Sequence, residues 1–207
     1  MPITATSQGG GNYEPVPEGN YIARCYSMIH IGTVMDTFQG ENKLTNKVRI
    51  TWELPTETKS FKEGEPERPY TIGKDFTLSL NEKATLRKFL ESWRGKAFSE
   101  DEARSFEITK LIGAPCMLNV IHKTSKTGKT YAEIAGVAKM PKGIECPGQY
   151  NETFIFHYEP FEQWRFDALP DWVKDKVKSS IEYQAVITPG HTTAAPAAET
   201  EDGDLPF

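Results

Sequence analysis

The stretch Lys47-Val-Arg-Ile-Thr-Trp-Glu-Leu54 decides the fold class of this chain. Apolar and polar residues alternate through it, so that every second side chain from Val48 to Leu54 lies on one face. An extended chain points successive side chains to opposite faces, and the alternation therefore predicts a β-strand with one buried face. Proline has no amide hydrogen to donate to a sheet, so we expect the strand to end at Pro55.

Other parts of the chain have the composition and spacing of strands as well. They are residues 20–31, 70–80, 115–123 and 130–138. The first of these alternates imperfectly. Polar loops are expected at residues 36–46 and 56–69, and a hairpin loop at residues 124–129.

A helical segment is predicted between the third and fourth strands. Four apolar residues recur there at the spacing of one helix face: Leu86, Phe89, Leu90 and Trp93. Asn81 is the expected N-cap of this helix, and Gly95 is expected to end it. The sequence Ser99-Glu-Asp-Glu102 has the pattern of a capping box and predicts a second, shorter helix.

Three strands, a helical segment and two more strands predict a mainly β protein with helices, in the order of the five-stranded OB-fold barrel. That barrel binds oligonucleotides on the face of its second and third strands and on the loops joining strands 1–2 and 4–5. We expect residues 19–140 to form it, behind a flexible N-terminal arm of residues 1–18. Residues 141–186 are rich in aromatic residues and include a helix predicted over residues 170–183, so we expect them to pack on the barrel as a helical extension.

Residues 187–207 predict a disordered acidic tail, because they hold few apolar residues to bury. All 24 Lys and Arg residues precede residue 182, and five of the 29 Asp and Glu residues follow residue 181, so residues 1–181 are neutral overall. The tail finishes with residues suited to docking on a partner protein: Asp202, Asp204, Leu205, Pro206 and Phe207. Phe207 would fill a pocket and the carboxylates would steer the approach. The alternative is an acidic tail that ends in Phe without a binding role.

Positive charge is concentrated near the predicted hairpin. Six lysines and one acid, Glu133, lie between residues 110 and 142. Single-strand binders combine such cations, which follow the phosphates, with aromatic rings on which bases stack. The residues that we predict to bind DNA are Arg24, Tyr26, Arg49, Trp52, Tyr70, Lys74, Phe76, Lys123, Lys126, Lys129 and Tyr131. The alternative for the aromatic residues is core packing, which we favour for Trp52, and the alternative for the lysines is a solvated hairpin.

Several other classes of protein find no support. Three widely separated cysteines without a paired Cys or His pattern predict a reducing, cytoplasmic location and no metal site. Gly128-Lys129-Thr130 lacks the earlier glycine of a P-loop, because position 123 is Lys. The sequence offers no catalytic triad, cofactor motif, secretion signal or apolar run long enough for a membrane. We therefore predict a protein that is not an enzyme and has no cofactor.

The basic hairpin, the aromatic strands and the acidic tail together resemble single-stranded-DNA-binding proteins of the bacteriophage type. Residues 20–54, residues 70–93 and the segment Leu169-Pro-Asp-Trp-Val173 also resemble that group. The tail tip is similar to the Pro-Phe-ended tail of the bacterial family, which recruits replication and repair enzymes. The bacterial acidic run is usually longer, whereas Gly203 interrupts this one, and that bears on the choice of partner.

The resemblance implies a protein that binds and protects single-stranded DNA during replication, recombination and repair, in the cytoplasm of a bacterial host. It also implies recruitment of replication and recombination proteins through the tip, with self-association left open. Three alternatives remain at this point: an annealing mediator that uses the same groove, a nuclease or other replication enzyme with an unrecognised site, and an adaptor that binds only proteins.

Overall fold

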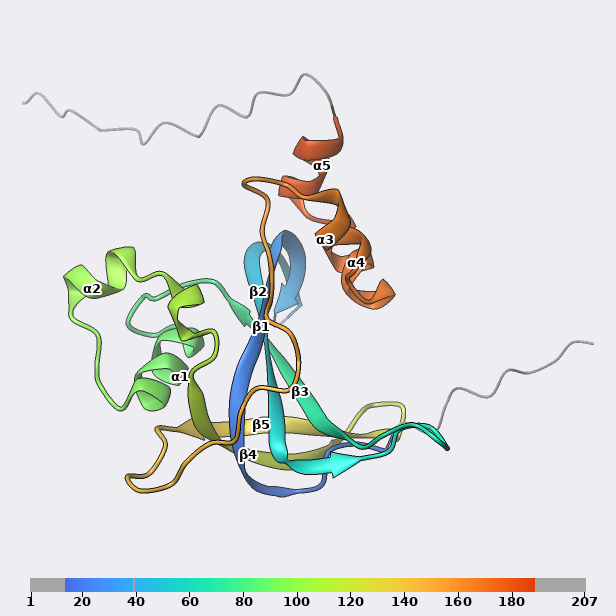
Figure 1. Ribbon diagram of the computed structural model, residues 1–207. Helices are drawn as coiled ribbons and strands as arrows, with labels where there is room; N and C mark the ends of the chain where they lie inside the picture. The colour runs from blue at the N-terminus through green and yellow to red at the C-terminus, as the bar shows by residue number, and fades with distance from the viewer. Residues whose placement is uncertain (1–13, 39, 189–207) are drawn as a thin grey trace, which may run out of the picture.

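The computed structural model describes residues 14–38 and 40–188, and its centre is one antiparallel sheet. The five main strands are β1 (Gly19–Phe38), β2 (Glu41–Lys59), β3 (Arg68–Thr77), β4 (Pro115–Thr124) and β5 (Thr130–Ala138). They lie in the order β3-β2-β1-β4-β5, and a short strand β6 (Phe154–Phe156) pairs in parallel with β1. The prediction of a mainly β protein with helices is confirmed (Figure 1).

The sheet is open, and the closed barrel that we predicted is not formed. β3 and β5 are the two ends of the sheet, and among the described residues no backbone ladder joins them. The Lys74 side chain of β3 instead donates from Nζ to the Ile134 carbonyl of β5 at 2.6 Å. A side chain therefore spans the gap that a backbone ladder would close.

β1 and β2 extend beyond the body as a long hairpin arm. The loop predicted over residues 36–46 is wrong, because Asp36 pairs with Lys43 and Thr37 with Asn42 in the ladder. The Thr37 hydroxyl also donates to Asn42 Oδ1 at 2.8 Å. The side chains of the arm are largely exposed, so the arm lacks the apolar alternation by which a half-buried strand is recognised.

β1 lies between two hydrophobic clusters, and this explains its irregular pattern. Its first half places Ala23 and Cys25 in the main core, and the pairing register then shifts between Cys25 and Ser27. After the shift, Ile29 and Ile31 enter a second cluster with the C-terminal helices. A shift of one residue moves the following side chains to the other face of a strand, so one strand serves two cores.

A helical segment covers the main core between β3 and β4. It consists of α1 (Thr85–Arg94), α2 (Glu100–Ser105) and the 3₁₀ helix η1 (Ile108–Leu111). The four residues predicted for the buried face of α1 are buried, and Gly95 ends the helix at φ 66°. The N-cap is Ala84 rather than Asn81. The predicted cap of α2 is confirmed, because the Glu102 backbone N–H donates to Ser99 Oγ at 3.2 Å.

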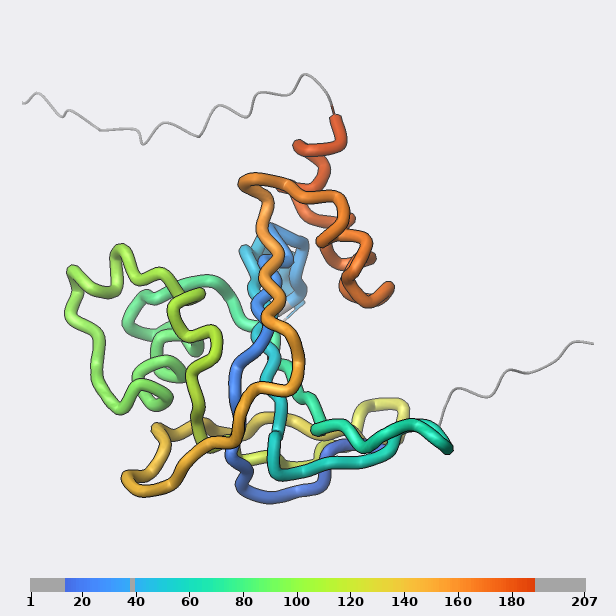
Figure 2. Tube along the Cα trace, in the orientation of Figure 1, coloured from blue at the N-terminus to red at the C-terminus, as the bar shows by residue number. Residues whose placement is uncertain are grey.

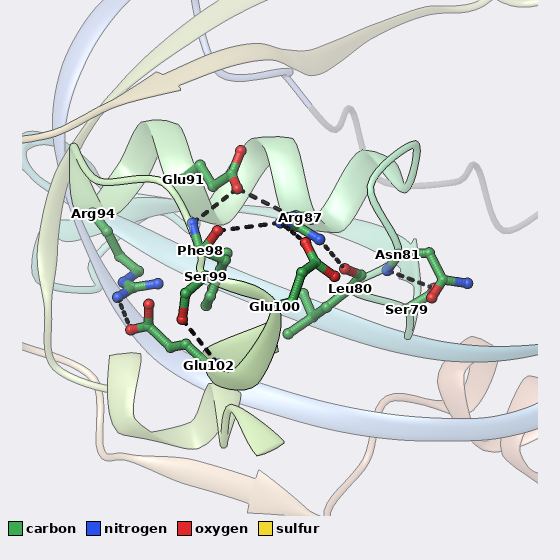
Figure 3. A network of polar contacts seen from close by, with 10 residues as sticks. All are labelled: Ser79, Leu80, Asn81, Arg87, Glu91, Arg94, Phe98, Ser99, Glu100 and Glu102. Carbon is green, nitrogen blue, oxygen red and sulfur yellow. Dashed lines mark hydrogen bonds and ion pairs between the residues drawn. The ribbon is translucent and has the colours of Figure 1, made fainter. Parts of the chain in front are cut away.

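Arg87, which is only 7% exposed, connects the parts of this helical segment through its polar contacts. Figure 3 shows these contacts. The Arg87 guanidinium donates to the carbonyls of Leu80 and Phe98, both at 3.2 Å, and forms ion pairs with Glu91 and Glu100. The loop before α1 and the start of α2 are thus fastened to one side chain. Each of these partners accepts from a charged donor, which makes a stronger bond than a neutral one.

The C-terminal part of the described chain rises along β1 and then forms three short helices (Figure 2). They are α3 (Gln163–Asp167), α4 (Asp171–Lys178) and α5 (Ile181–Ile187). The single helix predicted over residues 170–183 is therefore divided. The Ser180 hydroxyl accepts from the Tyr183 backbone N–H at 3.1 Å and caps a new helix, because the chain turns between α4 and α5.

α5 is fastened to the base of the hairpin arm. Glu182 accepts from the Thr33 backbone N–H at 2.6 Å and from the Thr33 hydroxyl at 2.7 Å. The neighbouring Gly32 has φ 90°, and a Cβ built there would lie 2.8 Å from Ser180 Cβ. The close approach of α5 to β1 therefore requires glycine at this position.

Candidate nucleic-acid interface

A cavity of about 480 Å³ opens on the face of β1, β2 and β3 that is turned away from the main core. Its floor includes Arg49 and Thr51, which alternate along β2 with the buried residues Val48 and Ile50. β5 contributes one wall and α4 another. We call this cavity the groove, and the lining residues that matter for its chemistry are Tyr26, Arg49, Thr71, Gly73, Tyr131 and Trp172.

Arg49 lies flat across the floor of the groove because the strand beside it carries glycine. A Cβ at Gly73 would come within 2.6 Å of Arg49 Nη2. The guanidinium carbon lies 4.4 Å from the centre of the Trp172 ring, and Nη1 donates to Asp75 Oδ1 at 2.6 Å. A planar cation stacked on an indole ring is a favourable arrangement, and it fixes the direction of the positive charge.

Three aromatic rings from separate elements line the groove. Tyr26 of β1 is half-buried, and this burial is the main cause that raises its pKa, so the hydroxyl stays protonated. Tyr131 of β5 is 42% exposed and Trp172 of α4 is 47% exposed. Exposed rings beside a fixed cation are the groups on which unpaired bases stack.

The predicted lysine hairpin continues directly into the β5 wall. Lys126 and Lys129 are exposed and, in the part of the chain that the structure describes, form no ion pair. Lys123 pairs with Glu133 at 3.0 Å, and this hydrogen bond raises the pKa of the lysine. Lys129 immediately precedes β5 and stands two residues before Tyr131 in the sequence.

Three of the aromatic residues predicted to bind DNA are core residues, and this part of the prediction is corrected. Trp52 is 0% exposed and packs on Phe89 and Trp93, with ring centres 5.6 and 5.5 Å away. Tyr70 and Phe76 are also buried in the main core. A ring with so little accessible surface cannot stack on a base, so the alternative of core packing applies to all three.

Two predicted cations are engaged by protein oxygens outside the cluster of rings. Arg24 donates to the Gly113 carbonyl at 2.6 Å and to the Pro147 carbonyl at 2.9 Å, and so holds the loop that follows β5. Lys74 bonds the Ile134 carbonyl and lies 3.8 Å from Glu133. These contacts join strands and loops, which indicates a structural role for both residues.

The sequence prediction did not include Trp172 and Lys176, because it assigned α4 to an extension that only packs. Lys176 Nζ lies 5.2 Å from the centre of the Trp172 ring and donates to Asp75 Oδ2 at 2.6 Å. A signal was present, since positions i and i+4 of a helix lie on one face and this pair is offset from the buried Val173 and Val177. That offset face is the one turned to the groove.

A second cavity, also of about 480 Å³, lies between the α2–η1 segment and β1, β2 and β6. Its lining includes Leu80, Phe106 and Ile108, with Arg104 as its only Arg or Lys residue within the described ranges. It is mainly apolar and has few groups that would contact phosphate. The groove, with its cation and three rings, therefore fits a nucleic acid better.

Comparisons with protein-family models, with curated proteins and with solved structures found no match to this chain. Within residues 14–38 and 40–188, no group of three or more His, Cys, Asp or Glu side chains could hold a metal ion. No helix in the same ranges is long and apolar enough to span a bilayer. The predicted partner-docking residues, Asp202, Asp204, Leu205, Pro206 and Phe207, lie outside the described residues.

Proposed function

We propose that this protein binds single-stranded DNA in the groove, with little sequence preference. The observation that carries the proposal is the stacked pair of Arg49 and Trp172, which lies in one cavity with the rings of Tyr26 and Tyr131. The cations would neutralise phosphates and the rings would stack on bases. Duplex DNA hides the faces of its bases, so unpaired strands would be preferred.

We also propose that the sheet is an opened form of the OB-fold. The strand order β3-β2-β1-β4-β5 is the order of that barrel when it is cut between the third and fifth strands. The bond from Lys74 to the Ile134 carbonyl lies across that cut. The groove is on β2 and β3 and beside the β4–β5 hairpin, which are positions that OB-fold proteins use for oligonucleotides.

Partner recruitment is the second half of the proposal, and it rests on the sequence alone. Residues 199–207 carry four acids followed by Leu205-Pro206-Phe207, and this combination suits capture by a basic, apolar pocket on another protein. Together with the groove, it supports a phage-type single-stranded-DNA-binding protein. Such a protein would cover exposed strands during replication, recombination or repair and bring other proteins to them.

Fluorescence anisotropy with labelled oligothymidylate and with a duplex of equal length, each at two salt concentrations, tests this proposal. We expect tighter binding of the single strand and an affinity that falls steeply with salt. Arg49→Gln should weaken binding, whereas Arg104→Gln, which removes an exposed arginine from the rim of the second cavity, should not. A larger effect of Arg104→Gln would move the site to the second cavity.

The same preparation separates the alternative functions. Accelerated pairing of complementary strands would favour the annealing mediator, and metal-dependent cleavage of the oligonucleotide would favour an enzyme. Absence of binding to oligothymidylate at low salt would leave only the adaptor. Each assay uses the full chain, so the tail is present throughout.

A further inference from the structure

Three charged side chains from three elements meet beside the groove, whose lining includes Arg49 but neither Asp75 nor Lys176. Asp75 of β3 accepts from Arg49 of β2 on one carboxylate oxygen and from Lys176 of α4 on the other, both at 2.6 Å. The Asp75 side chain is 23% exposed, so the groups meet at the boundary between protein and solvent. Two cations thus share one anion, and the set keeps a net positive charge.

The position of Asp75 is one that a phosphate could take. A phosphodiester has two non-bridging oxygens, and a carboxylate likewise presents two oxygens to separate cationic donors. Arg49 and Lys176 both lie over Trp172, at 4.4 and 5.2 Å from the ring centre. A phosphate held by this pair of cations would therefore place its nucleotide next to an exposed indole ring.

On the basis of the proposed function, we propose that Arg49, Lys176 and Trp172 form a subsite for one nucleotide. In the free protein, the Asp75 carboxylate occupies the phosphate position of this subsite. A backbone phosphate displaces the Asp75 carboxylate from Arg49 and Lys176, and the adjoining base stacks on Trp172. α4 is then part of the binding surface and not only packing for the sheet. In the free protein, Asp75 offsets part of the positive charge of Arg49 and Lys176, which lowers the affinity of these two cations for other anions.

The ionisation of Asp75 agrees with this arrangement. Burial acts to raise the pKa of Asp75, but the hydrogen bond from Lys176 and the charge and hydrogen bond of Arg49 outweigh it and hold the pKa below its ordinary value. Displacement by a phosphate would take both cations away from the carboxylate. The pKa of Asp75 must then rise when DNA binds.

The first test compares Asp75→Asn with Asp101→Asn, a control that removes the same charge from an exposed side chain on α2. We expect Asp75→Asn to tighten oligothymidylate binding by on the order of tenfold relative to the control, since no internal anion competes for the cations. The salt dependence should steepen by about 0.7 in log Kd per log salt concentration, the effect of one further net ion released. Equal affinity of the two variants, or weaker binding by Asp75→Asn, overturns the proposal.

The second test uses the unaltered protein, so it does not depend on the folding of a variant. The pKa of Asp75 is measured from its carboxyl ¹³C chemical shift, with and without saturating oligothymidylate. A rise on binding supports displacement, and an unchanged value overturns it. If the unaltered protein binds no oligothymidylate at low salt, the proposed function fails as well, whereas binding without any change at Asp75 removes this inference alone.

Discussion

At the scale of single residues, a substitution of Tyr131 should change the affinity for DNA without changing the stability of the fold. Its ring lines the groove and is 42% exposed, so little of the fold depends on it. We expect Tyr131→Ala to weaken oligothymidylate binding by about 1–3 kcal/mol, the contribution of one stacked base. The free energy of unfolding should stay within about 0.5 kcal/mol of the unaltered protein. Tyr150→Ala removes another exposed tyrosine, outside the groove, and should change neither quantity.

A substitution of Glu53 should lower stability rather than DNA affinity, because Glu53 is buried and lies outside the groove lining. Its carboxylate accepts from the backbone N–H groups of Tyr150 and Asn151, both at 2.8 Å, and from Asn151 Nδ2 at 2.6 Å. Glu53→Gln replaces an acceptor oxygen by a donor amide, so we expect the free energy of unfolding in urea to fall by about 1–3 kcal/mol. Glu63→Gln, on an exposed loop, is the control. Equal stability of the two variants would show that the carboxylate does not anchor the loop.

The contrast between Trp52 and Glu53 shows what the alternation of β2 could and could not predict. The pattern around Trp52 favoured a buried face, and the core contains that ring. The same pattern places Glu53 on the solvent side, yet it is 0% exposed because a loop almost 100 residues later folds over it. Local spacing predicts the face of a strand, but it carries no information on which distant segment will cover that face.

At the scale of elements, the β4–β5 hairpin should supply much of the salt dependence. Replacing Lys123, Lys126 and Lys129 together with Ala should flatten the salt dependence of log Kd by up to about 2, at roughly 0.7 for each phosphate contact. Lys123 should contribute least, since Glu133 already neutralises it. The control replaces Lys83, Lys88 and Lys96 in the α1 region, which changes net charge equally. If both triple variants have the same slope, the phosphate path does not pass the hairpin.

The docking of α5 should depend on pH through Glu182. Burial acts to raise the pKa of this carboxyl, but the hydrogen bonds from the Thr33 backbone and hydroxyl outweigh it and lower the pKa. A lowered pKa in the folded state stabilises the protein above the unfolded value of about 4.3, and this stabilisation is lost as pH falls through the lower folded value. Amide hydrogen exchange in α5 should therefore accelerate relative to the rest of the protein in acid.

Glu182→Gln is the matched variant for that measurement, because the side-chain amide does not titrate. We expect its α5 protection to be lower at neutral pH and to change little between neutral pH and pH 3. A pH dependence in this variant equal to that of the unaltered protein would assign the titration to another carboxyl group. Gly32→Ala should also loosen α5, since its Cβ would meet Ser180 at a positive φ.

Elements with one buried face were predictable, although the end expected for the second strand at Pro55 is wrong because β2 continues to Lys59. The residues of β5 were predicted with the bounds that the structure has, and the buried face of α1 was correct. The hairpin arm was predicted as a loop, because its exposed residues carry no apolar period. The chain breaks between α4 and α5 because the Ser180 hydroxyl caps a new helix. The helical spacing of apolar residues continues through this point and does not indicate the break.

At the scale of the whole molecule, the groove is lined both by strands of the sheet and by α4 of the C-terminal part. β1 separates the main core from the second hydrophobic cluster, and α4 is carried by that second cluster. The succession of the five main strands along the chain could be predicted from sequence, since part of each one has a local signal, whereas β6 was not predicted. The position of Trp172 over Arg49 could not, because it depends on the packing of Val173 and Val177 against the far side of β1.

The last prediction concerns the acidic residues 199–207 and separates their charge from their apolar tip. Deleting them removes four acids, so binding of oligothymidylate at low salt should be unchanged or tighter, because fewer carboxylates compete with phosphate for the cations. Recruitment of replication and recombination proteins, measured by co-sedimentation on DNA-coated beads, should be lost.

The matched control for this deletion replaces Leu205, Pro206 and Phe207 with Ala and keeps every acid. It should bind DNA as the unaltered protein does, yet fail in recruitment, because the pocket-filling groups are gone while the steering charges remain. Clearly weaker DNA binding by the deletion would contradict the proposal, since it would make the acidic segment part of the DNA-binding surface. Recruitment that survives the Ala substitutions would assign docking to the charges alone.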